Sequence, residues 1–238
     1  MDLRASAVNL PMRFIDRFQA ILFDMNGTFM FGHDRLGAEE DFFATYRSLG
    51  GCRLTSDEVR SHVLRICAGL QRDYNDPERF DSFPTLNDAV STYGRLDGED
   101  ARDISNVIAA HEVGRVPPWA ATTLRAISAT HALAVVTNVW APAEAWNEEF
   151  ARSGLSQVFR CRIFSSALGV VKPSFRMFST ALEQMHVEPS RALFIGDSME
   201  RDIRPARKLG LGTVFVGLES EAGEADLVIP SIEGLLDD

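Results

Sequence analysis

The 238-residue sequence is poor in the residues that build disulfide scaffolds, sulfur-based metal sites or membrane spans. Its three cysteines are widely spaced and form no C-x-x-C pair, which excludes a disulfide framework and a thiolate zinc site. No run of about 18 apolar residues is present that could span a bilayer. Arg13, Asp16 and Arg17 stand where a signal peptide would be apolar. We therefore expect a cytoplasmic protein with no membrane partner.

Positive charge is also scarce. The chain has 24 basic and 34 acidic side chains, a formal net charge of −10, which argues against nucleic acid as the main partner. Among the basic residues only Lys172 and Lys208 are lysines. The hydrophobic content of 45% is enough for a buried core in one large domain or two modest ones. Nothing in the sequence indicates the oligomeric state.

Five short apolar runs have the composition of strands that are buried on both faces of a sheet. Stretches with helical spacing lie between the later runs, and this alternation predicts an α/β fold with a parallel sheet. The expected strands are 20–23, 133–136, 192–195, 213–216 and 226–229, and the expected helices of this part are 143–153, 174–185 and 200–209.

The segment 37–116 interrupts this alternation. It has no strand-like run but four helical stretches, and Pro117 with Pro118 should end the last of them, because proline lacks the backbone donor that a helix needs. We therefore predict a core made of residues 1–36 and 117–238 and a helical cap of residues 37–116. One continuous α+β domain is the alternative. The expected cap helices are 38–49, 56–74, 85–93 and 99–113.

Polar residues follow three of the predicted strands. Asp24 follows the first strand, Thr137 and Asn138 the second, and Asp197 and Ser198 the third. Sites in parallel sheets form at the carboxyl ends of strands, so these side chains are expected to meet in one crevice. Two carboxylates there would need a cation, and oxygen ligands suit Mg²⁺. Taken singly, each residue could instead be a helix cap or a turn residue.

Two further positions favour a bound phosphate. Gly27 lets the loop after Asp24 turn tightly and brings backbone N–H groups close to an oxyanion. Lys172 places a compact positive charge beside the start of a predicted helix, where phosphate groups bind favourably. A solvated surface lysine is the alternative for Lys172.

Together these motifs resemble the four ordered motifs of the haloacid dehalogenase (HAD) superfamily, over about residues 19–230. The resemblance implies a Rossmann-like parallel sheet core with an inserted α-helical cap domain that closes over the active site. The motifs are Phe23-Asp24-Met25-Asn26-Gly27-Thr28, Val136-Thr137-Asn138, Val171-Lys172-Pro173 and Ile195-Gly196-Asp197-Ser198-Met199-Glu200-Arg201-Asp202.

The resemblance also implies a role for each matching residue. Asp24 would be the nucleophile that forms an aspartyl-phosphate, and Lys172 would neutralise charge beside it. Mg²⁺ would be held by Asp24, Asp197 and the backbone carbonyl of Asn26. The resemblance also implies that the substrate would be bound by Gly27, Thr28, Thr137 and Asn138. Ser198 and Asp202 would hold Lys172 or the metal ligands in position.

Asn26 departs from the family pattern, in which an aspartate at this position protonates the leaving oxygen and activates water. An amide cannot transfer that proton. We expect a magnesium-dependent phosphatase acting on a small phosphorylated metabolite. The alternatives are an impaired relative that binds a phosphorylated ligand or a partner, and a hydrolase of the haloacid dehalogenase type. His33 lies just past the first motif, either within reach of the pocket or as an ordinary surface or core histidine.

Overall fold

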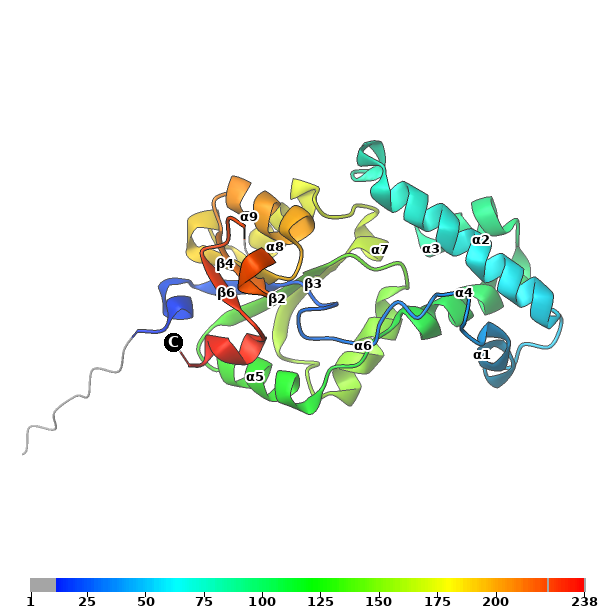
Figure 1. Ribbon diagram of the computed structural model, residues 1–238, viewed down its shortest axis with the longest axis horizontal. Helices are drawn as coiled ribbons and strands as arrows, with labels where there is room; N and C mark the ends of the chain where they lie inside the picture. Colours follow the sequence, from blue (N-terminus) through cyan, green and yellow to red (C-terminus); the bar gives the residue numbers. More distant parts are fainter. Residues whose placement is uncertain (1–11, 222, 238) are drawn as a thin grey trace, which may run out of the picture.

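A parallel sheet forms the centre of the molecule. The computed structural model describes residues 12–221 and 223–237. Within them six strands lie in the order β3-β2-β1-β4-β5-β6, and every neighbouring pair is parallel (Figure 1). This confirms the predicted α/β, Rossmann-like fold. The strands are β1 (Ala20–Phe23), β2 (Ala132–Thr137), β3 (Phe159–Phe164), β4 (Ala192–Gly196), β5 (Gly212–Val216) and β6 (Leu227–Ile229).

Helices cover both faces of the sheet, which explains why β1 is apolar at every position. Ile21 and Phe23 point into one hydrophobic cluster, and Ala20 and Leu22 into a second cluster on the opposite face. Helices α5 (Pro118–Ser128) and α6 (Ala143–Arg152) supply the first cluster, and α8 (Phe175–Met185) and α9 (Arg204–Lys208) the second. Burial of these apolar side chains is the main source of stability for the core.

A group of helices between β1 and β2 lies beside the sheet, at the end of the molecule away from the C-terminus (Figure 1). They are α1 (Phe42–Ser48), α2 (Ser56–Asn75), α3 (Leu86–Ala89) and α4 (Gly98–Glu112). Their buried side chains, among them Tyr46, Val63 and Ile108, form a third hydrophobic cluster. All four helices fall within 37–116, and the exact cap boundaries stay a prediction. We call α1–α4 and the loops between them the helical insertion.

The shorter elements complete the description. Helix α7 (Ser165–Leu168) follows β3, and two π-helical turns, Val90–Gly94 and Met199–Ile203, continue α3 and precede α9. The 3-10 turns are Phe14–Arg17, Pro77–Arg79, Pro189–Arg191, Glu219–Glu221 and Ile232–Leu235.

Three expectations about individual elements were wrong. Strand β3 was not predicted, because its sequence FRCRIF lies at a sheet edge where arginines face solvent and break the apolar run. Helix α5 was missed because it begins at Pro118, a residue that ends helices but is also favoured at the first helical position. Helix α1 begins at Phe42 rather than at residue 38.

The predictions about cysteines and membrane spans can be compared directly with the described residues. Cys52, Cys67 and Cys161 are all free thiols, as expected. In the ranges 12–221 and 223–237, none of the helices combines the length and the apolar character needed to cross a bilayer.

The aromatic cluster between α6 and β3 offers a test of the core. Phe150 is fully buried, with ring centroids 6.5 Å from Phe29 and 5.4 Å from Phe159. We expect Phe150→Ala to lower the free energy of unfolding by about 3–5 kcal/mol, because it removes buried apolar surface and leaves a cavity. Chemical denaturation measures this loss. Phe175→Ala is the matched control because Phe175 is 45% exposed, and equal losses in the two variants would contradict the description of this core.

Candidate active site

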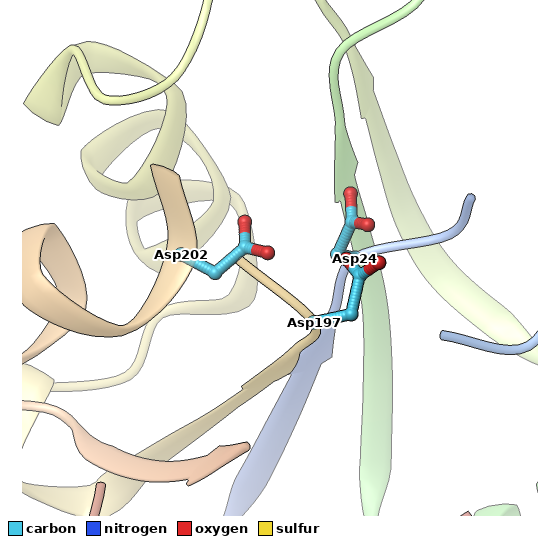
Figure 2. A group of neighbouring side chains, drawn as sticks. All are labelled: Asp24, Asp197 and Asp202. Carbon is cyan, nitrogen blue, oxygen red and sulfur yellow. The ribbon is translucent and has the colours of Figure 1, made fainter. Parts of the chain in front are cut away.

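Three acidic side chains meet at the carboxyl ends of the central strands. Asp24 directly follows β1 and Asp197 directly follows β4, and these two strands are neighbours in the sheet. Asp202 faces them from the π-helical turn that follows (Figure 2). One oxygen from each of the three carboxylates lies within 4.8 Å of the others. The predicted convergence of Asp24 and Asp197 is therefore present in the structure.

A buried lysine holds two of these carboxylates. Lys172 Nζ donates hydrogen bonds to Asp24 Oδ1 and to Asp202 Oδ1, both at 2.6 Å, and Lys172 is only 2% exposed. Burial alone would lower the pKa of Lys172, but the charges and hydrogen bonds of the two carboxylates outweigh it and raise that pKa. The second oxygen of Asp202 accepts a hydrogen bond from the Ser198 N–H at 3.0 Å. Asp202 is thus fully occupied in holding Lys172 and the loop after β4.

The cluster keeps excess negative charge. Burial, together with the Asp24 and Asp202 carboxylates, raises the pKa of Asp197 to about 7. Burial raises the pKa of Asp202 to about 6, with Asp24 adding to the effect and Lys172 opposing it. One ammonium group faces three carboxylates, so two negative charges have no partner when all three are ionised. A site of oxygen donors with this excess charge suits a divalent cation such as Mg²⁺.

The loop after Asp24 is packed directly against Asp197. Gly27 has a φ of +81°, and a Cβ atom there would lie 2.1 Å from Asp197 Oδ2, so only glycine fits without a shift. Asn26 Oδ1, Thr28 Oγ1 and Thr137 Oγ1 are buried and have no hydrogen-bond partner within residues 12–221 and 223–237. Buried polar atoms are normally paired, so the two unpaired atoms that belong to cavity-lining residues, Asn26 and Thr137, indicate a place for a polar ligand.

A cavity of about 350 Å³ gathers most of the residues predicted for the site. Gly27 and Thr28 do not line it: Gly27 packs behind Asp197, and the Thr28 side chain is buried in the loop. The predicted residues that line the cavity are Asp24, Asn26, Thr137, Asn138, Lys172, Asp197, Ser198 and Asp202.

The cavity also has walls that were not among the predicted site residues. Tyr74 comes from the helical insertion, Arg201 from the turn after β4, and Asp34 from the segment before α1, next to His33, which also lines the cavity. The Arg201 guanidinium carbon lies 3.7 Å from the centroid of the Tyr74 ring, and its nitrogens donate to the carbonyl oxygens of Tyr74 at 2.7 Å and Lys172 at 2.5 Å. Asn138 Nδ2 lies 3.0 Å from the Tyr74 hydroxyl oxygen, to which it donates. Tyr74 is near the end of α2, so these contacts join the helical insertion to the loops that carry the carboxylates. No sequence motif indicates that Tyr74 and Arg201 lie at the cavity, because their positions depend on how α2 packs against the core.

A second cavity of about 370 Å³ opens beside the first and shares Asp34, Tyr74 and Asn138 with it. Its remaining walls come mainly from the helical insertion and mix apolar with polar side chains. They are Leu36, Leu64, Cys67, Ala68, Gln71, Glu112 and Trp140. The two cavities together offer a charged compartment and an adjoining compartment with room for an organic group.

The family model for haloacid dehalogenase-like hydrolases matches residues 18–210. The chain belongs to this family of enzymes. It is 27% identical to glyceraldehyde 3-phosphate phosphatase of Methanopyrus kandleri over 182 residues, which cover 68% of this chain and 76% of the relative. Its fold is similar to that of the HAD phosphatase from Thermococcus onnurineus, with a TM-score of 0.61 and 21% identity, over 92% and 96% of the two chains. A 2-haloacid dehalogenase from Pseudomonas syringae pv. Tomato DC3000 gives a TM-score of 0.60 at 20% identity, over 92% and 97%.

Repulsion among the carboxylates predicts a measurable effect on the stability of this HAD-like hydrolase. In metal-free buffer at pH 8 we expect Asp197→Asn to raise the Tm by about 2–4 °C, or about 1 kcal/mol. Neighbouring groups partly desolvate the Asp197 carboxylate, but the residue as a whole is exposed, so solvent screens much of the repulsion. The pKa of Asp197 is raised to about 7 in the folded state, so the folded protein holds this proton more tightly than the unfolded chain. The wild type therefore loses stability as pH rises from about 4 to about 7.

Thermal unfolding in EDTA across this pH range, with exposed Asp237→Asn as the matched control, measures the difference. The gain from Asp197→Asn should disappear toward pH 4. A lower Tm than the wild type at pH 8 would show that the Asp197 carboxylate stabilises the metal-free fold, contrary to this account.

Proposed function

We propose that this HAD-like hydrolase is a phosphatase that cleaves a small phosphorylated metabolite through an aspartyl-phosphate on Asp24. The observation that carries the proposal is the buried Lys172, whose Nζ lies 2.6 Å from Asp24 Oδ1 and from Asp202 Oδ1. A buried charge is costly unless it is paired with an opposite charge. Here the Lys172 ammonium is paired with the carboxylate of Asp24, at the end of the central strand β1.

Two residues of the chain would support the attack. Lys172 places positive charge beside the oxygen atoms on which negative charge gathers as the phosphoryl group is transferred. The buried Thr137 Oγ1 has no hydrogen-bond partner in the structure and would donate to a phosphoryl oxygen. When Asp24 bonds to phosphorus, the bond from phosphorus to the leaving oxygen breaks. Water then attacks the aspartyl-phosphate and returns Asp24 to its carboxylate form.

We propose that Asp24, Asp197 and the backbone carbonyl of Asn26 hold Mg²⁺. The donor set fits because it consists of oxygen atoms and carries uncompensated negative charge, whereas both oxygens of Asp202 already accept hydrogen bonds. The metal would supply positive charge against the phosphoryl oxygens. Ser198 and Asp202 keep a supporting role in this arrangement.

The substrate class follows from the two cavities. The phosphoryl group would occupy the carboxylate-lined cavity, and a small organic group would occupy the adjoining one of about 370 Å³. The similarity to a glyceraldehyde 3-phosphate phosphatase supports a small phosphate ester as the partner of this site. The expected cytoplasmic location stays a prediction.

One of the two alternative functions has a specific observation in its favour. Asn26 stands where a proton donor is needed, which is compatible with a relative that binds a phosphorylated ligand and turns it over poorly.

An aryl phosphate tests the proposed function, because its leaving group departs without protonation. We expect the wild type to hydrolyse p-nitrophenyl phosphate in Mg²⁺ and to lose activity in EDTA, with recovery when Mg²⁺ is added back. Asp24→Asn should lower kcat by at least about 10³-fold, since it removes the nucleophile. Asp237→Asn is the matched control. Activity that survives in Asp24→Asn would contradict the nucleophile assignment, and an inactive wild type would favour the ligand-binding alternative.

A further inference from the structure

The missing acid at position 26 has a candidate replacement in the same cavity. We propose that His33 carries out the two proton transfers that Asn26 cannot, and that Asp34 positions the His33 imidazole. This inference rests on the proposed phosphatase function. It names the residue that would protonate the poor leaving group of an alkyl phosphate and so allow its hydrolysis. General acid–base help of this kind is typically worth about 10²–10⁴ in rate.

His33 is placed for this role by its surroundings. It lines the cavity that contains Asp24, and its side chain is only 26% exposed. Its Nδ1 is buried and has no hydrogen-bond partner among the residues that the structure describes, while its Nε2 lies 3.6 Å from Asp34 Oδ2. The separation of 3.6 Å is too long for a hydrogen bond, but it places the Asp34 carboxylate beside the ring, where a small shift would let it orient the imidazole. The unpaired Nδ1 is the nitrogen left for proton transfer. A substrate oxygen would be the partner that Nδ1 lacks.

The other ionisable groups that line this cavity are less suited to the task. Lys172 and Asp202 are bound to each other. Burial is the main cause that raises the pKa of the Tyr74 hydroxyl above its ordinary value, so this group does not exchange protons near neutral pH. Asp34 is 56% exposed and faces His33. An imidazole can both donate and accept a proton, which the leaving oxygen and the attacking water require in turn.

The backbone fixes the loop that carries His33. Phe31 and Arg115 exchange backbone hydrogen bonds at 3.0 and 2.8 Å, and the Asp34 N–H donates to the Glu112 carbonyl at 3.1 Å. Gly114 lies directly against this loop, where a Cβ atom would come within 2.7 Å of the Phe31 carbonyl oxygen and 3.1 Å of His33 Cβ. The position of His33 is therefore set by the two segments that connect the core to the helical insertion, one before α1 and one after α4.

Each proton transfer by His33 accompanies one bond change at phosphorus. Asp24 bonds to phosphorus, the bond from phosphorus to the leaving oxygen breaks, and that oxygen takes the proton from Nδ1 of the His33 imidazolium. The neutral imidazole then takes a proton from water as the water oxygen bonds to phosphorus. The bond between phosphorus and Asp24 breaks, phosphate leaves, and the imidazolium is restored.

Leaving-group dependence tests this inference. His33→Asn keeps a hydrogen-bonding group but cannot carry a proton, so kcat for an alkyl phosphate such as glycerol phosphate should fall by about 10²–10⁴-fold. With p-nitrophenyl phosphate the same variant should release one nitrophenol per enzyme in a burst, followed by slow turnover, because only the second step lacks its base. His186→Asn, at an exposed histidine, is the matched control. Asp34→Asn should lower kcat for the alkyl phosphate more than it changes KM.

Rescue separates a chemical role from a structural one. Adding Asn26→Asp to His33→Asn restores a carboxyl group at the first motif, and alkyl-phosphate turnover should recover by at least about tenfold. The inference is overturned if His33→Asn keeps alkyl-phosphate kcat within about threefold of the wild type, or if the wild type hydrolyses only the aryl substrate. A wild type that hydrolyses neither substrate would refute the proposed function itself.

Discussion

The ion cluster around Lys172 is the constraint on which the rest of the site depends. An ammonium group that is 2% exposed must be paired, and its two partners are Asp24, at the end of β1, and Asp202, in the π-helical turn after the neighbouring strand β4. Each of these two hydrogen bonds therefore fixes the position of the loop that carries the carboxylate. Asp202 also accepts the Ser198 N–H, which shapes the turn that presents Asp197. The negative charge left over in the cluster suits a divalent cation, and a phosphoryl group would need that cation and Lys172 to offset the repulsion.

The same cluster is tied to the helical insertion. Arg201 donates to the carbonyl oxygens of Lys172 and Tyr74, and Asn138 binds both the Tyr74 hydroxyl and the Lys172 backbone N–H. The insertion thus reaches the lysine loop through backbone contacts rather than through apolar packing alone. On the opposite side, the chain crossings at Phe31 and Arg115 bring His33 to the cavity. Core and insertion together define the space in which a substrate would be held.

Most of the fold and part of the site could be predicted from the sequence, for identifiable physical reasons. Central strands such as β1 are apolar throughout because both faces are covered, so composition alone reveals them. Edge strand β3 carries exposed arginine and gives no such signal. Asp24 and Asp197 were predictable because strand ends converge in any parallel sheet. The roles of Tyr74 and Arg201 depend on how α2 packs against the core, which no local pattern records.

The central claim is that Asp24 becomes phosphorylated during turnover. The most direct measurement mixes the wild-type enzyme with p-nitrophenyl phosphate and Mg²⁺, quenches the reaction in acid within milliseconds, and maps its peptides by mass spectrometry. The account predicts one phosphoryl group on the peptide at Asp24, and none on the same peptide of Asp24→Asn. A phosphoryl group on His33, or continued turnover with Asp24 never modified, would contradict it.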